Sequence, residues 1–293
     1  MSPAAPAGPA PFGARLAAAA DRFGPLCVGI DPHPALLEAW GLDDDVAGLR
    51  RFALTVLDAL VGEVAVLKPQ AAFFERHGSR GVAVLEEVLA AVRGEATQVV
   101  LDAKRGDIGS TMAGYADAYL REGAPLACDA LTVSPYLGVG ALGPAVRAAE
   151  AAGRGLFVLA LTSNPEGAGV QHAVGPEGES VAGAVVRQVA AHNARALEAA
   201  PAPLGPFGLV VGATVGDAVG SLGIDLAAVR GPILAPGVGA QGAGPAELAD
   251  VFGEARRAVV ASVSRSVLEA GPATTALRDA AARAGEDAGR ALR

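Results

Sequence analysis

The stretch Gln98-Val99-Val100-Leu101-Asp102-Ala103-Lys104 is apolar from its second to its fourth residue and ends in two charges. Its apolar residues follow one another directly, whereas a strand with one face in water would alternate apolar and polar residues. Such a run is typical of a strand that is buried on both faces in a parallel sheet. The fold therefore depends on how many strands of this kind the chain contains and on what separates them.

Eight such stretches occur, and the segments between them carry Ala, Leu, Glu and Arg with helical periodicity. We expect strands at residues 26–31, 64–69, 98–104, 128–134, 155–162, 207–213, 232–235 and 258–263. Helices are expected, among other places, at residues 73–92, 111–122, 142–152, 180–200, 245–252 and 272–292. This alternation predicts a single-domain (β/α)8 TIM barrel over residues 12–293, preceded by a flexible Ala/Pro-rich terminus at residues 1–11.

An open, doubly wound sheet is the alternative fold for this pattern. Its dinucleotide-binding form needs G-x-G-x-x-G after the first strand, where backbone N–H groups bind a pyrophosphate. Here the first strand leads into Gly29-Ile30-Asp31-Pro32-His33-Pro34, and prolines supply no N–H donors. The barrel is therefore favoured, and the Gly/Pro-rich segment 164–178 is expected to be a long loop at its active end.

The composition is typical of a globular cytoplasmic protein. Hydrophobic residues make up 52% of the chain, but no apolar run is long enough to span a membrane. The net charge of -8 argues against a nucleic-acid-binding protein. Cys27 and Cys128 lie in apolar stretches and are expected to be buried free thiols, which fits a reducing compartment. The four histidines lack the spacing of a metal site.

Charged side chains gather where the first three predicted strands end, and TIM barrels hold their active sites at that end. Asp31, Lys68 and the pair Asp102 and Lys104 are at these positions, and Asp107 follows closely. Only two of the 23 basic residues are lysines, which can release a proton where arginines cannot. Asp102 and Lys104 are two residues apart on a strand and should point to the same side. An array of Lys68, Asp102 and Lys104 would fix a proton donor; the alternative is a salt-bridge network that only closes the barrel end.

The loops after the seventh and eighth strands have the features of a phosphate site. The turn at residues 236–242, which includes Pro236, Gly237 and Gln241, lets backbone N–H groups approach an anion, and a helix is expected to begin just after it. Arg265 follows the eighth strand beside Ser264. Each feature alone is compatible with an ordinary loop, but these two loops are the usual phosphate site of such barrels.

Four further polar residues have two interpretations each. Asp31 either binds ribose hydroxyls or caps its loop. Ser163 and Asn164 either hydrogen-bond a heterocycle or form the turn that Asn164-Pro165 favours. Thr111 caps the following helix or belongs to the site.

Together these motifs resemble the orotidine 5′-phosphate decarboxylase family, and in particular its longer bacterial subfamily (type 2). The segment Asp102-Ala103-Lys104-Arg105-Gly106-Asp107-Ile108 looks like the family's D-x-K-x-x-D-I signature. The segments 27–34, 67–75, 161–165, 236–242 and 264–266 are similar to its other motifs and occur in the expected order.

The resemblance implies a carboxy-lyase that converts orotidine 5′-phosphate to uridine 5′-phosphate and CO2 in pyrimidine biosynthesis, without a metal or cofactor. Lys104 would protonate C6 of the pyrimidine, and Asp102 would lie against the departing carboxylate. Lys68 and Asp107 would complete the charged array.

Binding roles are implied in the same way. Asp31 and Lys68 would contact the ribose, Ser163 the pyrimidine edge, and Gln241 and Arg265 the phosphate; Asn164, Pro236, Gly237 and Ser264 complete the substrate-binding set. Ser264 departs from shorter members of the family, which have Gly there. In this family Asp107, Ile108 and Thr111 reach into the partner subunit's site, so the resemblance implies a homodimer.

Two other functions would fit parts of the pattern. A relative with the same barrel and D-x-K-x-x-D acts on sugar phosphates with magnesium, but it would need further acidic ligands near Asp102. A non-catalytic sensor of nucleotide phosphates would bind uridine 5′-phosphate without turnover. The intact array of lysines and aspartates argues against the sensor.

Overall fold

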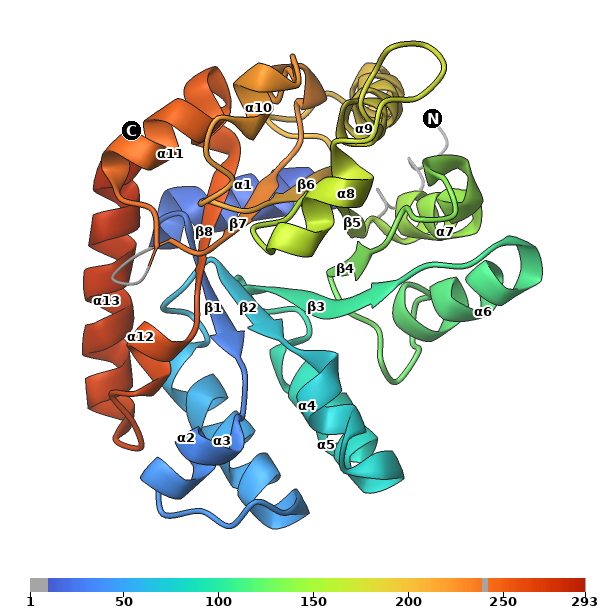
Figure 1. Ribbon diagram of the computed structural model, residues 1–293. Coiled ribbons are helices and arrows are strands. Elements are labelled where there is room, and N and C mark those ends of the chain that lie inside the picture. The colour runs from blue at the N-terminus through green and yellow to red at the C-terminus, as the bar shows by residue number, and fades with distance from the viewer. Residues whose placement is uncertain (1–9, 239–241, 293) are drawn as a thin grey trace, which may run out of the picture.

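Eight parallel strands close into a barrel in the computed structural model, which describes residues 10–238 and 242–292 (Figure 1). The strands follow one another around the barrel in sequence order, and β8 pairs with β1. They are β1 (Leu26–Ile30), β2 (Val66–Pro69), β3 (Gln98–Arg105), β4 (Ala130–Val133), β5 (Gly155–Leu161), β6 (Phe207–Val211), β7 (Ile233–Pro236) and β8 (Val259–Val263). The predicted TIM barrel is confirmed, and every predicted strand overlaps the observed one.

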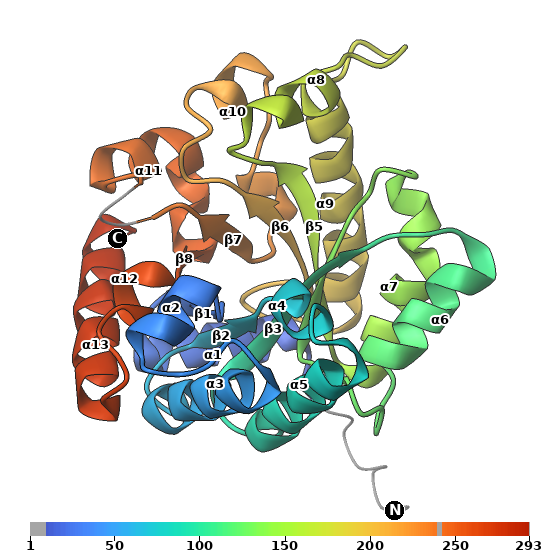
Figure 2. The same cartoon turned by 60° about the horizontal axis from the view of Figure 1, so that its bottom comes forward.

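Helices surround the barrel and bury its outer face (Figures 1 and 2). They are α1 (Phe12–Phe23), α2 (Pro34–Ala39), α3 (Val46–Leu60), α4 (Ala71–Glu75), α5 (Gly78–Val92), α6 (Gly109–Tyr119), α7 (Gly143–Ala152), α8 (Ala168–Gln171), α9 (Val181–Ala199), α10 (Ala218–Ser221), α11 (Pro245–Phe252), α12 (Arg265–Leu268) and α13 (Thr274–Ala291). Short 3₁₀ helices are η1 (Val139–Leu142), η2 (Pro165–Gly167), η3 (Ala227–Val229) and η4 (Gly253–Ala258). In the described part of the chain, no helix has both the length and the apolar character needed to cross a membrane.

The helical layer differs from the expectation in two places. The helix expected at 73–92 is divided into α4 and α5, because Gly78 adopts a positive φ of 65° at the junction. The segment 164–178, expected to be a loop, contains η2 and α8. The predicted flexible terminus lies mostly in residues 1–9, outside the described residues.

The barrel interior is filled by one apolar layer below the site. Each strand contributes one buried member, in chain order Cys27, Val66, Val100, Ala130, Phe157, Val210, Leu234 and Val260. Phe12 and Leu16 of α1 belong to the same cluster and are fully buried. This part of the interior is therefore packed solid, and a ligand can enter only at the carboxyl ends of the strands.

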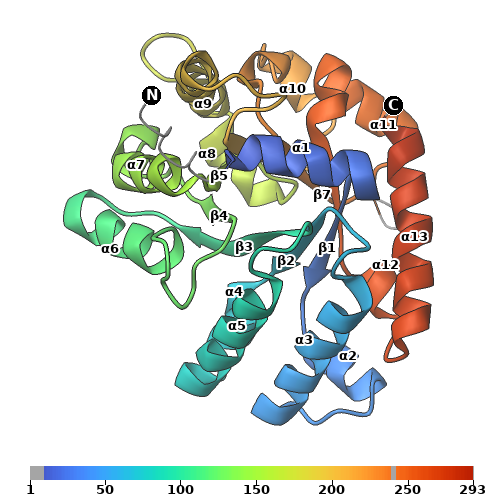
Figure 3. The ribbon, with the colours of Figure 1, turned by 180° about the vertical axis from the view of Figure 1, so that it is seen from behind.

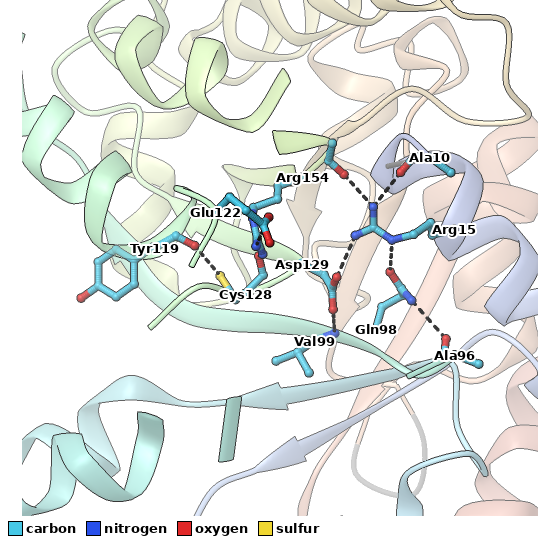
Figure 4. Close-up of polar contacts among 11 residues, drawn as sticks. Ala10, Arg15, Ala96, Gln98, Val99, Tyr119, Glu122, Cys128, Asp129 and Arg154 are labelled. Carbon is cyan, nitrogen blue, oxygen red and sulfur yellow. Dashed lines mark hydrogen bonds and ion pairs between the residues drawn. The ribbon is translucent and has the colours of Figure 1, made fainter. Parts of the chain in front are cut away.

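Helix α1 closes the end of the barrel where the strands begin (Figure 3). Arg15 holds it there: its Nη2 lies 2.7 Å from Asp129 Oδ1, its Nε donates to Gln98 Oε1 at 3.0 Å, and its Nη1 donates to Gly153 O at 2.7 Å (Figure 4). These partners come from the starts of three neighbouring strands. The polar network is thus structural, and it leaves the carboxyl ends of the strands as the open face.

Candidate active site

A cavity of about 790 Å³ opens at the carboxyl ends of the strands. Its volume suits a ligand of nucleotide size. It brings together ten of the residues expected from the sequence: Asp31, Lys68, Asp102, Lys104, Ser163, Asn164, Pro236, Gly237, Ser264 and Arg265. Among the described residues, no group of three or more His, Cys, Asp or Glu side chains is arranged to hold a metal ion.

Two lysines and two aspartates form a charged array in the floor of this cavity. Lys68 Nζ on β2 lies 3.3 Å from Asp102 Oδ2 on β3 and 3.9 Å from Asp31 Oδ1 after β1. Lys104 Nζ lies 2.5 Å from Asp102 Oδ1. The side chain of Lys68 is only 8% exposed, whereas that of Lys104 is 46% exposed and faces the cavity. The sequence-based expectation that Lys68, Asp102 and Lys104 meet is therefore confirmed.

Opposite charges keep the buried members of this array ionised. Burial lowers the pKa of Lys68, but the carboxylates of Asp31 and Asp102 outweigh it, so this pKa lies above its ordinary value. Burial also raises the pKa of Asp102, but Lys68 and Lys104 outweigh it, so this pKa lies below its ordinary value. At neutral pH the site therefore holds a carboxylate between two cations.

The backbone at Lys104 departs from a regular strand. Lys104 has φ of 46°, a value that non-glycine residues seldom adopt, and the pairing of β3 with β4 shifts register between Leu101 and Arg105. Asp102 and Lys104 thus share a side as expected, but through a bulge that the strand pattern does not reveal. Strained backbone of this kind often occurs at functional sites.

Two neutral donors at Asp102 were not identified from the sequence. Thr132 Oγ1 on β4 donates to Asp102 Oδ1 at 2.9 Å, and Gln70 Nε2, just after β2, donates to Asp102 Oδ2 at 3.0 Å. With Lys68 and Lys104, each carboxylate oxygen of Asp102 has one charged and one neutral donor. The carboxylate is therefore held in one orientation.

Asp31 has a buried carboxylate oxygen without a hydrogen-bond donor. Its Oδ1 is buried and has no hydrogen-bond partner among the described residues, although Lys68 Nζ lies 3.9 Å away. A buried carboxylate oxygen without a donor is costly unless a ligand supplies one. Gly29 makes room for this side chain, because a Cβ there would lie 2.8 Å from Asp31 Oδ2 and 2.1 Å from Ser264 Oγ.

The loops after β7 and β8 form another wall of the cavity. Gly237 has φ of 89°, and a Cβ on Gly242 would lie 1.7 Å from Gly237 O, so both glycines are required by the turn. Arg265 begins α12 and is exposed to the cavity; it forms no salt bridge with any residue that the structure describes. Gln241 lies outside the described residues.

The helix expected after the glycine-rich turn is present as α11, but its first turn is already capped. Glu247 Oε2 accepts a hydrogen bond from Gly244 N at 3.0 Å. This carboxylate accepts from the N–H group just before the helix and places a negative charge in its first turn, which disfavours a bound anion there. The backbone of the turn and Arg265 are therefore the anion-binding groups that remain.

Ser163 and Asn164 lie at the rim of the cavity and differ in whether their side chains are already hydrogen-bonded. The Asn164 side chain takes part in its own turn, because Oδ1 accepts from Thr162 Oγ1 at 2.7 Å and Nδ2 donates to Glu166 Oε2 at 3.0 Å. Ser163 lines the cavity and is exposed. The turn interpretation thus describes Asn164, and Ser163 has the freer side chain.

Asp107, Ile108 and Thr111 are not part of the cavity wall. Asp107 Oδ1 accepts from Ile108 N at 2.8 Å, and Ile108 is 61% exposed. Thr111 lies in the first turn of α6 and is exposed, with no side-chain hydrogen bond at the helix N-cap. The three residues lie just before and within the first turn of α6, outside the cavity of a single chain.

Comparisons with known proteins give a consistent result. The family model described as "Orotidine 5'-phosphate decarboxylase / HUMPS family" matches residues 24–280. An orotidine 5′-phosphate decarboxylase of Streptomyces coelicolor is 61% identical over 274 residues, which cover 93% of this chain and 95% of that protein. The corresponding protein of Salinispora tropica is 59% identical over 281 residues, covering 96% of this chain and 98% of that one.

Solved structures show the same similarity. A crystal structure described as an orotidine 5′-phosphate decarboxylase from Streptomyces avermitilis is 60% identical, with a TM-score of 0.91 over 98% of this chain and 97% of that one. The OMP decarboxylase of Leishmania donovani is 30% identical, with a TM-score of 0.73 over 96% of this chain and 98% of that one.

Proposed function

Because this chain belongs to the orotidine 5′-phosphate decarboxylase / HUMPS family, we propose that it removes CO2 from orotidine 5′-phosphate to form uridine 5′-phosphate. The observation that carries the proposal is the array in which Lys104 Nζ, 2.5 Å from Asp102, faces a cavity of nucleotide size. The relatives at 61% and 59% identity are both named for this activity. The reaction belongs to pyrimidine biosynthesis, and we expect the enzyme to act in the cytoplasm.

The substrate is oriented by groups at opposite sides of the cavity. We place its phosphate against Arg265 and the backbone of the turn at Pro236 and Gly237, with Ser264 beside it and Gln241 as a further contact. The ribose hydroxyls then meet Asp31, whose Oδ1 lacks a donor, and Lys68. The pyrimidine is directed toward Ser163 and the rim at Asn164, with C6 toward Lys104.

The bond from C6 to the carboxylate carbon breaks heterolytically in this proposal. CO2 leaves, and the electron pair remains on C6 while the ammonium of Lys104 stabilises the developing charge. Lys104 Nζ then donates a proton to C6, and solvent restores that proton to the amine. Asp102 lies beside the departing carboxylate and repels it, and no metal or organic cofactor takes part.

Binding of the phosphate, which is remote from C6, contributes to catalysis at C6. Contacts of Arg265 with the phosphate can supply binding energy that orients C6 against Lys104, which would favour the transition state over the bound substrate. We therefore propose that the loops after β7 and β8 mainly bind the substrate, whereas the charged array in the cavity floor carries out the chemistry.

A homodimer completes the proposed site. Three large apolar side chains near the starts of α6 and η1 are exposed to solvent. Their exposed fractions are 61% for Ile108, 78% for Tyr136 and 54% for Leu137. A second copy seated there would bury them and bring its Asp107, Ile108 and Thr111 to the neighbouring cavity. Asp107 would then be a fifth member of the charged array.

A decarboxylase assay tests the function directly. We expect the purified protein, after exhaustive EDTA treatment, to convert orotidine 5′-phosphate with a change in ultraviolet absorbance. Activity that appears only with added magnesium, or on a sugar phosphate instead, would favour the magnesium-dependent relatives. Tight binding of uridine 5′-phosphate without turnover would identify a sensor.

A further inference from the structure

Thr132 lies at the centre of the charged array without carrying a charge itself. It belongs to β4, is 1% exposed, and lies beside the bulge of β3. Its Oγ1 donates to Asp102 Oδ1 at 2.9 Å and accepts from the backbone N–H groups of Ala103 at 3.0 Å and Lys104 at 2.9 Å. One hydroxyl thus contacts three consecutive residues of the site.

These three contacts use the whole bonding capacity of the hydroxyl. A threonine hydroxyl has one hydrogen to donate and two lone pairs that accept. Both lone pairs of Thr132 are taken by backbone N–H groups, so its hydrogen is directed at Asp102. The Thr132 hydroxyl therefore has no donor or acceptor site left for a substrate, although the residue is part of the cavity lining.

The same hydroxyl supports the unusual backbone of Lys104. A residue with φ of 46° persists only where its surroundings compensate for the strain. The register shift on β3 takes the N–H groups of Ala103 and Lys104 out of the regular ladder with β4, and Thr132 accepts both. A single atom, Thr132 Oγ1, therefore holds both the backbone of Lys104 and the carboxylate of Asp102 in place.

We propose that Thr132 is a positioning residue that holds Lys104 and Asp102 in the geometry needed for proton transfer. This inference rests on the proposed decarboxylase function. Thr132 acts through the two charged residues and makes no contact with substrate. Gln70 Nε2 supports the opposite oxygen of Asp102 but makes no contact with Lys104, so it cannot replace the hydroxyl.

Replacing Thr132 by valine removes the hydroxyl and keeps the shape of the side chain. We expect Thr132→Val to lower kcat by about 10- to 100-fold, because Asp102 loses a donor and the N–H groups beside Lys104 lose their acceptor. KM and the dissociation constant for uridine 5′-phosphate should change by less than about threefold, because the binding groups stay in place. Thr132→Ser, which restores the hydroxyl, should recover most of kcat.

Thr97 offers a matched control at the other end of the barrel. It is also fully buried, and its Oγ1 donates to Val64 O at 2.8 Å and accepts from Gly62 N at 2.8 Å. Thr97→Val therefore removes a comparable buried hydroxyl just before β3 begins. We expect it to lower the unfolding temperature and to leave kcat of the folded enzyme within about twofold.

The outcomes separate the possible explanations. An unchanged kcat in Thr132→Val, or a rise in KM alone, would overturn the positioning role. If the valine variant does not fold, Thr132→Ser and Thr132→Ala provide the comparison, because they differ only in the hydroxyl; equal kcat values would overturn the inference. If the unmodified protein does not decarboxylate orotidine 5′-phosphate, the proposed function fails before this comparison is reached.

Discussion

Lys68 Nζ lies 3.3 Å from Asp102 Oδ2, across the boundary between β2 and β3, with both side chains almost withdrawn from water. The same ammonium lies 3.9 Å from Asp31 Oδ1. Removing one partner of a buried ion pair leaves the other charge uncompensated. The array therefore has consequences for stability that can be measured apart from catalysis.

Lys68→Met should destabilise the protein in a pH-dependent way. The pKa of Asp102 is lowered in the fold, so its ionised form contributes stability above its ordinary pKa of 3.8, and this contribution is lost as the pH falls further. The pKa of Lys68 is raised, so its contribution is complete below 10.5 and is lost as the pH rises through the folded value.

We therefore expect the variant to lose about 3 to 5 kcal/mol of unfolding free energy between roughly pH 5 and pH 9. The difference from wild type should shrink below about pH 4, because Asp102, which keeps Lys104 but has lost Lys68, takes up a proton at higher pH in the variant than in wild type. Urea unfolding of both proteins from below pH 4 to about pH 9 measures this difference in unfolding free energy. Arg50→Met is the control, since it breaks an exposed pair with Glu87 and should cost less than about 1 kcal/mol. A difference that does not vary with pH would contradict the role of the array.

Arg265→Ala should weaken the binding of phosphate-bearing ligands selectively. Arg265 is the exposed cation of the cavity wall after β8. We expect affinity for uridine 5′-phosphate to fall by about two orders of magnitude, and affinity for uridine, which has no phosphate, to stay the same. Titration calorimetry with both ligands decides this, and Arg290→Ala, an exposed arginine of α13, serves as the control. Equal losses for both ligands would remove Arg265 from the phosphate site.

Both cysteines should be inert in the folded protein. Burial raises the pKa of Cys27 and of Cys128 to about 12, and the two thiols are 0% and 2% exposed. At pH 8 only about one thiol in ten thousand would be ionised. A colorimetric disulfide reagent should label neither thiol in native protein within minutes and both after denaturation. Rapid labelling of the native form would show that the packing around these thiols opens.

Ile108→Asp should break the proposed dimer and lower activity with it. Ile108 is 61% exposed in the single chain, so the change should not disturb the fold of one subunit. We expect sedimentation to show monomers and kcat/KM to fall by at least tenfold, because the partner's contribution to the site is lost. Val174→Asp is the matched control: Val174 is 67% exposed, but it lies in the segment before α9, away from α6. A dimer that survives Ile108→Asp would place the interface elsewhere.

The sequence was sufficient to predict the barrel and the array because both depend on where strands end. A strand that is apolar throughout and then carries Asp102 and Lys104 can be located without coordinates, and parallel strands bring their ends together. Glu247 was also within reach, since the spacing of Gly244 and Glu247 is that of a helix-capping pair. That spacing predicts a carboxylate in the first turn of α11, where it disfavours a bound anion.

Thr132 and the backbone of Lys104 were beyond the reach of the pattern. Threonine is common in strands, so its presence in the fourth strand does not indicate a role. Its three hydrogen bonds depend on a register shift between β3 and β4, and such a bulge leaves no mark in the order of apolar and polar residues. Gln70 is uncharged and follows β2 directly, so nothing in its sequence position indicates its hydrogen bond with Asp102.

The central claim is that Lys104 supplies the proton to C6 in a site that works without metal. The most direct test compares wild type and Lys104→Ala in EDTA, measuring decarboxylation of orotidine 5′-phosphate and binding of uridine 5′-phosphate. We predict that wild type is active, and that the variant is folded, binds the nucleotide within about tenfold of wild type and has no measurable turnover. Turnover by the variant close to the wild-type rate, or loss of its fold by circular dichroism, would contradict the claim and leave the array a structural salt-bridge network.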